Sequence, residues 1–449
     1  MSIEDMVAWL ECHPNISSLR AVVCDLNGTM RGKRMPIDQV QKALGGGIRM
    51  PLSAASVDIW GEDIVGSELV FASGDTDGIC EWTGRDILEM DWLAQPTGMI
   101  PLWLSTDQGK PFTGDPRRAL ASVVERYAEH GLTPVTATEL EFYLVDATGS
   151  RPVSVRSPFT GKRLFSDGIL SNEELDQFEP FLNDVYDACA LQNIPVDTAI
   201  AEGGAGQFEI NLLHQANPLK AADDAVFFKQ VVKGVARSHG FTATFMAKPY
   251  GNRAGSGFHL HFSLLEKAGN NIFDDGTEKG SDKMRHAIGG LLAAMAESTL
   301  VFAPHFNSYR RLRPDTHAPV AICWGYENRT AALRIPGGPV SARRIEHRVA
   351  GADANPYLVM AAILGAALEG IERQIEPMNP INGNSYGLDL PLLPTDWLSS
   401  IDAFESGVLI NRVFSPVLRR LFVSCKKQEM AKFVTQVSDF EYQSYLASL

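Results

Sequence analysis

Two histidines follow a glycine-rich turn in the stretch KPYGNRAGSGFHLHFSL, which runs from residue 248 to residue 264. On an extended strand His259 and His261 lie on one face, because side chains alternate with a period of two residues. The pattern is compatible with a phosphate-binding loop, a metal ligand or a plain surface turn. Two imidazoles directly after Gly-Ser-Gly favour a functional site over ordinary polar surface residues.

Carboxylates occur in two further strand-like segments. In TELEFYL, Glu139 and Glu141 share one face, so that two negative charges lie roughly 6–7 Å apart. This pair predicts either a solvated face or a bound cation, and solvation is the simpler interpretation of the segment alone. In AEGGAGQFE, Glu202 and Glu209 flank a glycine turn that lets them converge, although many surface loops have the same composition.

Between residues 310 and 348 the chain has eight arginines and no lysine, with Glu346 among them in ARRIEHR. The planar guanidinium binds carboxylate and phosphate groups in a bidentate manner, whereas an ordinary solvated surface mixes lysine with arginine. The carboxylates and histidines could bind hard divalent cations such as Mg²⁺ or Mn²⁺. The residues alone therefore predict a metal-dependent enzyme that uses ATP and acts on a carboxylate.

Composition limits the classes of protein to which the chain could belong. Its 449 residues, 45% apolar and 21% charged, predict a folded protein of two domains. A formal charge of −14 argues against nucleic acid or an anionic membrane as a partner. Six well-separated cysteines without a C-x-x-C pair predict reduced, buried thiols in a cytoplasmic protein. The longest apolar run, residues 357–371, is too short to span a bilayer, and the N-terminus does not resemble a signal peptide.

The order of the expected elements is that of an α+β protein. A helix is expected at about residues 2–12, followed by a hairpin at Asn27-Gly28 and a mostly β region to residue 105. The turn-rich segment 109–116 predicts a boundary between a domain of residues 1–108 and one of residues 109–449. In the larger domain an apolar helical stripe ends at Gly131. Strands are expected at 133–145, 194–201, 208–213, 241–247 and 258–264, with helices around 178–185 and 228–235.

The motifs together resemble the glutamine synthetase family. KPYGNRAGSGFHLHFS fits the ATP-region signature of that family, and the blocks ELEFYL, EGGAGQFE, NSYRRLRP, ENRTAALRIP and RRIEHR…ADANPYL follow its order. The resemblance extends from about residue 20 to the C-terminus and is most specific over 110–372. It implies a small β-grasp-like N-terminal domain and a larger catalytic domain with an antiparallel sheet and helices. It also implies active sites between subunits of a homo-oligomer, usually a dodecamer of two stacked hexameric rings.

The resemblance assigns roles to the residues at the motif positions. At least two Mg²⁺ or Mn²⁺ ions per site are implied. Ligands of the ion beside the glutamate γ-carboxylate would be Glu141, Glu202 and Glu209. Ligands of the ion that bridges the ATP phosphates would be Glu139, His259 and Glu346.

The remaining roles concern the substrates. Binding of glutamate is implied for Arg311, Arg348 and the backbone of Gly255. Contacts with phosphate and the transition state are implied for Arg334, Arg344 and the catalytic Arg329. The residues beside the nucleotide would be His261 and Ser263.

Two acids that bind ammonium in glutamine synthetases have no counterpart in this chain. The small-domain stretch that carries the aspartate reads MPLSAAS at residues 50–56, and His317 takes the place of the flap glutamate in RLRPDTHAP. Because a small cation in a dry site needs opposite charge, their loss disfavours ammonium. CWGYENRT and YGLDLPLLPTDW also resemble the γ-glutamylpolyamine synthetase branch. The expected amine is therefore organic, a polyamine or a monoamine.

Several residues are candidates for handling such an amine. His317 could take its proton, since an imidazole titrates near pH ~6.5, or could simply shape the flap. Asp315 is a candidate to hold the distal cationic group of a diamine. Met50, Leu52 and Trp60 are candidates for an apolar wall.

The resulting hypothesis is an ATP-dependent ligase that joins the γ-carboxylate of L-glutamate to an organic amine through γ-glutamyl phosphate, in amine catabolism or detoxification. The first alternative is a true glutamine synthetase that uses ammonium. Others are a non-catalytic structural or regulatory homologue, and a carboxylate or guanidino kinase that consumes ATP without forming an amide. Small-molecule substrates and further copies of the chain are the expected partners, with no nucleic acid and no membrane.

Overall fold

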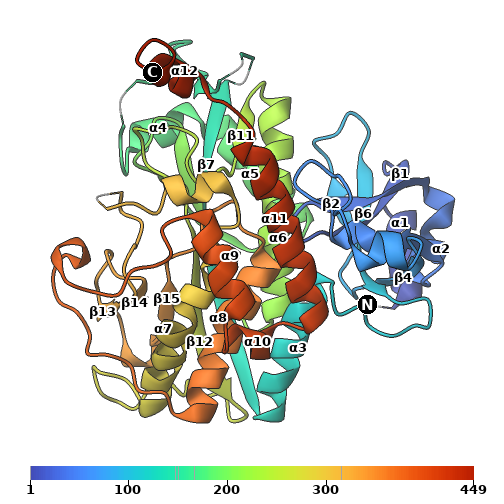
Figure 1. Cartoon of the computed structure of the whole chain (residues 1–449). Helices are drawn as coiled ribbons and strands as arrows, with labels where there is room; N and C mark the ends of the chain where they lie inside the picture. Colours follow the sequence, from blue (N-terminus) through green and yellow to red (C-terminus); the bar gives the residue numbers. More distant parts are fainter. Residues whose placement is uncertain (1, 147, 150, 166, 315) are drawn as a thin grey trace.

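The computed structural model describes residues 2–146, 148–149, 151–165, 167–314 and 316–449, which form two β-sheets with associated helices (Figure 1). The first sheet has the strand order β2-β1-β6-β4-β3, and β5 pairs with β6. Its strands are β1 (Ser18–Cys24), β2 (Met30–Pro36), β3 (Ile48–Pro51), β4 (Asp77–Trp82), β5 (Leu88–Met90) and β6 (Thr97–Ser105). The predicted hairpin joins β1 to β2, and Gly28 in its turn has a φ of 76°, which favours glycine.

Short helices accompany this sheet. Helix α1 (Ile3–Glu11) begins with the predicted capping box between Ser2 and Asp5. Helix α2 (Val40–Leu44) and two short helical turns, at Leu52–Ala55 and Glu68–Ala72, interrupt the region that the sequence predicted to be mostly β.

The second sheet has the order β13-β14-β15-β12-β7-β10-β9, with β8 and β11 also paired to β7. Its pairings are antiparallel except that between β13 and β14. The strands are β7 (Leu132–Asp146), β8 (Val153–Ser154), β9 (Val196–Ala201), β10 (Gln207–Gln215), β11 (Thr242–Thr244), β12 (Phe258–Glu266), β13 (Trp324–Tyr326), β14 (Leu333–Ile335) and β15 (Ile345–His347). Strand β11 is shorter than the predicted 241–247, because it pairs only with residues 143–145 of β7.

Helices pack against the second sheet and against one another. They are α3 (Pro116–Glu129), α4 (Asn172–Gln177), α5 (Glu179–Leu191), α6 (Pro218–Ser238), α7 (Asp282–Phe302), α8 (Pro356–Arg373), α9 (Trp397–Ser406), α10 (Ile410–Val413), α11 (Pro416–Val434) and α12 (Asp439–Tyr445). The apolar run 357–371, which the sequence analysis found too short to span a bilayer, lies within α8, and α8 packs along α7. Among the described helices, none is both long and apolar enough to cross a membrane.

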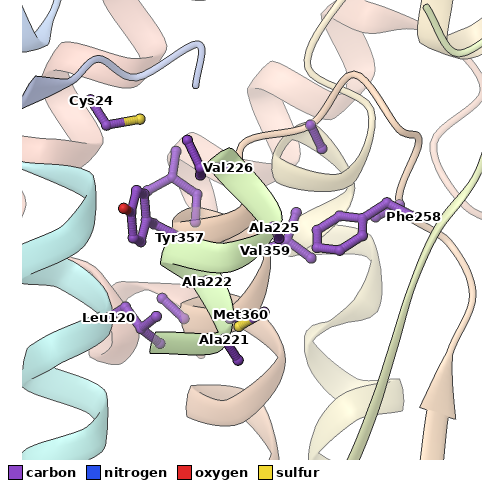
Figure 2. Packing of buried hydrophobic residues seen from close by; sticks show 14 of the residues in the cluster. Cys24, Leu120, Ala221, Ala222, Ala225, Val226, Phe258, Tyr357, Val359 and Met360 are labelled. Carbon is purple, nitrogen blue, oxygen red and sulfur yellow. The ribbon is translucent and has the colours of Figure 1, made fainter. Parts of the chain in front are cut away.

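A continuous apolar core connects the two sheets. Figure 2 shows Cys24 of β1, Val226 of α6 and Tyr357 of α8 in one buried cluster. The α+β fold class is thus confirmed, whereas the division at residues 108 and 109 stays a prediction. All six cysteines are free thiols, as expected. Cys12 is exposed rather than buried, because it caps the C-terminal end of the surface helix α1.

Candidate functional site

Strand register brings the predicted acids and histidines together on one face of the second sheet. Glu139 on β7 lies opposite His259 on β12, and Glu141 on β7 lies opposite Glu209 on β10. Glu139 and Glu141 are two residues apart on the same strand, so the two cross-strand pairs form neighbouring rows. Strand pairing therefore brings the side chains of this alternating pattern together in a cluster that spans three strands.

A third row extends this cluster towards the arginine-rich segment. His261 on β12 lies opposite Glu346 on β15, and Arg334 on β14 lies on the other side of Glu346. Glu346 is completely buried and forms ion pairs with Arg348 and with Arg334, whose Nη1 is 2.9 Å from Oε2 of Glu346. Burial opposes ionisation of Glu346. The charges of Arg348 and His261 together outweigh this effect and lower the pKa of the carboxyl.

Glu139 is enclosed by the two histidines. Nδ1 of His259 lies 2.9 Å from Oε2 of Glu139, and Nε2 of His261 lies 2.7 Å from Oε1. Although burial favours the neutral acid, these hydrogen bonds lower the pKa of Glu139 well below its usual range. The solvated-face interpretation of the Glu139 and Glu141 segment is therefore wrong, because the side chain of Glu139 is only 23% exposed and is already bound on both oxygens.

The neighbouring carboxylates lack this compensation. Glu209 is buried, and burial together with the charges of Glu139 and Glu141 raises its pKa to about 10. Glu202, at the turn between β9 and β10, has its pKa raised to about 7 by burial and by Glu141. The plain surface-loop interpretation is thus wrong for Glu209. Like charges gathered at this density create a site that a cation would stabilise.

The glycine-rich turn before β12 completes one wall of the cluster. The backbone N–H of Gly257 donates to Oε2 of Glu141 at 2.8 Å. A Cβ atom at Gly257 would lie 2.8 Å from Nε2 of His259 and 2.9 Å from Nη2 of Arg311, so a larger residue there would displace these two side chains. At Gly255, a Cβ would lie 2.8 Å from Cγ of Arg311. The turn is therefore a close backbone approach to the site.

The other predicted arginines are placed differently from one another. Arg311 is buried and donates from Nη1 to the backbone oxygen of Val349 at 2.8 Å. Nε of Arg344 lies 3.3 Å from Nδ1 of His261, whereas Arg329 is exposed. Ser263 is half-buried and follows His261 on the same face of β12.

The donor set fits a hard divalent cation. Two groups each offer ligand atoms within 4.8 Å of one another: Glu139, His261 and Glu346 form one, and Glu139, Glu209 and His259 form the other. This grouping differs from the expected one, because the register places His261 rather than His259 opposite Glu346. Carboxylate-rich sites with imidazole are compatible with Mg²⁺ or Mn²⁺. Which residues bind each ion stays a prediction.

The residues expected to contact the amine differ in their exposure. His317 is exposed in a turn, with a φ of 59°, and Asp315 lies outside the described residues. Met50 is buried in the core around the first sheet and so does not form a free pocket wall, contrary to expectation. Leu52 is half-buried, and the Trp60 ring is 44% exposed.

Two polar residues of β10 were missed by the sequence analysis. Asn211 lies opposite Glu139, and its Oδ1 is buried without a hydrogen-bond partner within the described chain. Gln207 donates from Nε2 to the backbone oxygen of Gly255 at 3.0 Å and to Oε2 of Glu141 at 3.3 Å. The signal was present in the alternation Q-x-E-x-N around Glu209, which predicts a shared face.

Comparison with known proteins agrees with this arrangement. The family model for the glutamine synthetase catalytic domain matches residues 113–445. Gamma-glutamylputrescine synthetase PuuA of Escherichia coli strain K12 is 35% identical over 446 residues, which cover 98% of this chain and 94% of that protein. A glutamine synthetase of Pyrococcus abyssi is 33% identical over 427 residues, covering 93% and 90%. A solved structure of GmaS in complex with ADP has a TM-score of 0.86 at 27% identity and covers 98% of this chain and 99% of that one.

Proposed function

The chain belongs to the glutamine synthetase family, and on that premise we propose that it is an ATP-dependent ligase which joins the γ-carboxylate of L-glutamate to an organic amine. The observation that carries the proposal is the cluster of carboxylates and histidines on the second sheet, with buried arginines beside it. Opposite charges arranged in this way can hold an anionic substrate and phosphate groups together. The organic amine follows from the two missing acids.

The cluster would hold two or more Mg²⁺ or Mn²⁺ ions. When bound, such ions neutralise the charge of phosphate oxygens and position them for transfer. The side chains proposed to bind them are Glu139, Glu141, Glu202, Glu209, His259 and Glu346. His261 also qualifies by its distance to Glu139.

The reaction proposed has two steps. An oxygen of the glutamate γ-carboxylate forms a bond to the γ-phosphorus of ATP, and the bond between that phosphorus and the ADP oxygen breaks. The amine nitrogen, after losing a proton, then bonds to the acyl carbon of γ-glutamyl phosphate, and phosphate leaves. Arg311, Arg348 and the Gly255 backbone are proposed to hold glutamate. The residues proposed to contact the nucleotide and its phosphates are His261, Ser263, Arg329, Arg334 and Arg344.

The choice of amine rests on residues 50–56 and on His317. Neither MPLSAAS nor the position of His317 supplies a carboxylate, so an ammonium ion would lack its countercharge. The relative named as a γ-glutamylputrescine synthetase supports an organic amine. The similarity to a glutamine synthetase is almost as high, and it keeps ammonium as the second candidate.

The test is phosphate release with glutamate, ATP and Mg²⁺, comparing ammonium with putrescine, spermidine, ethanolamine, isopropylamine and phenethylamine. Product masses should show the amide of glutamate with the preferred amine. We expect one organic amine to exceed ammonium in kcat/KM by orders of magnitude. Preference for ammonium would instead identify a glutamine synthetase, and ATP consumption without amide would identify a kinase. Absence of any ATP turnover would indicate a non-catalytic homologue.

His317 is proposed as the base that takes the proton of the amine. The variant His317→Ala should lose rate most strongly between about pH 7 and pH 9, where a neutral imidazole can accept a proton from an amine that is still charged, and the loss should shrink at lower pH, where an imidazole is protonated. An unchanged rate and pH profile would leave His317 only a role in shaping its turn. Because His317 is exposed, the substitution should change stability by no more than about 1 kcal/mol, although alanine is less favourable than histidine at its left-handed backbone.

The proposed assembly is a homo-oligomer, a dodecamer of two stacked hexameric rings with active sites between subunits. In that arrangement the small domain of a neighbouring copy would complete the amine pocket, which accords with the place of residues 50–56 at the end of β3 and in the helical turn after it, whereas the acidic cluster lies on the second sheet. Light scattering on the purified protein measures the number of copies directly. A monomer that is fully active would contradict the shared site.

A further inference from the structure

A cavity of about 540 Å³ lies between the first sheet and α6, and none of the candidate catalytic residues lines it. Its walls come from β1, β2, the turn between them, β6 and α6. In Figure 1 the first sheet, in blue, lies beside the large part of the molecule that contains α6. The basic side chains that line the cavity are Arg20, Lys33, Arg34, Lys229 and Lys233. None of the lining residues that the structure describes is acidic.

The cations are arranged in like-charge pairs. Arg20 and Arg34 lie directly opposite each other on the antiparallel strands β1 and β2. Lys229 and Lys233 are one turn apart on α6. Both arrangements place like charges next to each other. Such repulsion destabilises the folded chain unless another interaction compensates for it. Two such pairs on opposite walls of one cavity indicate a place for negative charge between them.

The described part of the chain offsets these charges only weakly: Asp353 favours the charged form of Lys229, but burial and Lys233 outweigh it. Within the described ranges none of the five cations forms an ion pair, and their hydrogen bonds go to neutral oxygens. Nζ of Lys33 donates to the backbone oxygen of Arg49 at 2.6 Å, and Nη2 of Arg34 donates to Oγ of Ser18 at 3.4 Å. Nζ of Lys229 donates to the backbone oxygen of Ala354 at 2.8 Å. This concentration of positive charge occurs in a chain whose net charge is −14.

The surroundings of Lys229 disfavour its charged form. The side chain is partly buried above the rings of Phe245 and Phe258, at 5.7 and 5.9 Å. Burial and the neighbouring Lys233 lower the pKa of Lys229 to about 7. A bound anion would restore the charged form, so its binding and the protonation of Lys229 favour each other.

We propose that this cavity is a binding site for a small, multiply charged anion that carries phosphate or carboxylate groups. Arginine forks on one wall and ammonium groups on the other can contact different oxygens of one such ligand. The site is separate from the acidic cluster, whose charge would repel the same ligand. Inorganic phosphate and a dicarboxylate represent the two sources of this chemistry.

The cavity is connected to the candidate catalytic site by short contacts. Lys229 binds the oxygen of Ala354, and the N–H of Ala352, two residues earlier, donates to the backbone oxygen of Ser256 at 3.0 Å. The next residue, Gly257, donates to Glu141. An anion that draws Lys229 towards the cavity would therefore act on the loop that supports the Gly257 turn, and the KM for glutamate is expected to change when the cavity is filled.

The test is calorimetric titration of the metal-free, full-length assembly with inorganic phosphate and, separately, with succinate. We expect saturable binding of at least one of them. Arg20→Gln and Lys233→Gln should each weaken that binding by about tenfold, because each removes a charged hydrogen bond. Lys42→Gln, at an exposed position of α2 outside the cavity, is the matched control and should titrate like the wild type.

The charge-conserving variants Arg20→Lys and Lys233→Arg should retain most of the affinity. Lys233 is exposed on its helix, so that Lys233→Gln remains informative even if Arg20→Gln folds poorly. Binding of phosphate alone or of succinate alone would identify the preferred group and support the site. The proposal is overturned if the wild type binds neither anion, or if Lys233→Gln and Arg20→Gln bind both as tightly as the wild type. This readout involves no turnover and is independent of the proposed ligase activity.

Discussion

Glu209 on β10 and Glu429 on α11 are both buried carboxylates, yet their pKa values shift in opposite directions. Burial and three neighbouring glutamates raise the pKa of Glu209 to about 10. Burial acts on Glu429 in the same sense, but the ammonium of Lys426 and the imidazole of His305 together outweigh it and lower the pKa to about 2. The two sites differ because the chain itself supplies the countercharge in one of them only.

Around Glu429 each polar group has a partner. Nζ of Lys426 lies 2.9 Å from its Oε2, and Nδ2 of Asn27 and the N–H of Ile59 donate to Oε1 at 3.1 and 2.9 Å. Asn27 and Ile59 belong to the N-terminal part of the chain. Their hydrogen bonds to Glu429 therefore connect that part of the chain to α11 (Figure 1). A carboxylate whose hydrogen-bond and charge partners belong to the chain stabilises the fold. A carboxylate surrounded by like charges needs a bound cation or another ligand to compensate for the repulsion, and it therefore indicates a functional site.

The largest effect expected from this difference is on turnover. Glu209→Gln removes a carboxylate that a bound cation would ionise and use as a ligand, and it should lower kcat by about 10³-fold, since metal coordination contributes several kcal/mol to charge stabilisation in a transition state. The stability of the metal-free protein should not fall, because burial and the neighbouring glutamates already keep this carboxyl from ionising and glutamine is neutral without having to take up a proton. Steady-state rates and a melting curve measure both. Turnover at the wild-type rate would show that the cluster is not catalytic.

The second prediction applies the same chemical change to the satisfied carboxylate. Glu429→Gln leaves the ammonium of Lys426 buried without its countercharge and should lower the free energy of unfolding by about 3–5 kcal/mol. Chemical denaturation measures the loss. Glu173→Gln, at an exposed position of α4, is the control and should have little effect.

A double variant checks the cause of that loss. Lys426→Met combined with Glu429→Gln should recover part of the stability, because it removes the unpaired charge. If Glu429→Gln alone denatured like the wild type, the network would not hold the two parts of the molecule together.

Much of the candidate site could be anticipated from the sequence, whereas this network could not. The alternation around Glu139 and Glu141 places both on one face, and the glycines before His259 indicate a close backbone approach. Pairing register is a property of several strands at once, so the sequence did not reveal that His261 faces Glu346. Nothing local distinguishes Lys426 and Glu429 from an exposed i,i+3 pair, because their burial depends on residues far away in the chain: Asn27, in the turn between β1 and β2, lies 402 residues from Glu429.

The third prediction concerns acid. The pKa of Glu429 is about 2 in the folded chain against an ordinary 4.5, so its contribution is fully present above pH 4.5 and is lost as the pH falls towards 2. The difference corresponds to at most about 3 kcal/mol. Wild-type stability should therefore decline over this interval more steeply than that of Glu429→Gln. Parallel pH profiles for the two proteins, measured from denaturation midpoints, would contradict the assignment.

The smallest effect is that of divalent cations on the metal-free protein, and it separates the two carboxylates most directly. A cation that binds only the folded chain adds about 2.7 kcal/mol of stability at a concentration of 100 times its Kd. Melting curves with and without Mg²⁺ should show this gain for the wild type and for Glu429→Gln, but a smaller gain for Glu209→Gln. Mn²⁺ should act at the same site if oxygen ligands dominate. An equal gain in all three proteins would place the cation away from β10, and the repulsion around Glu209 would then need another explanation.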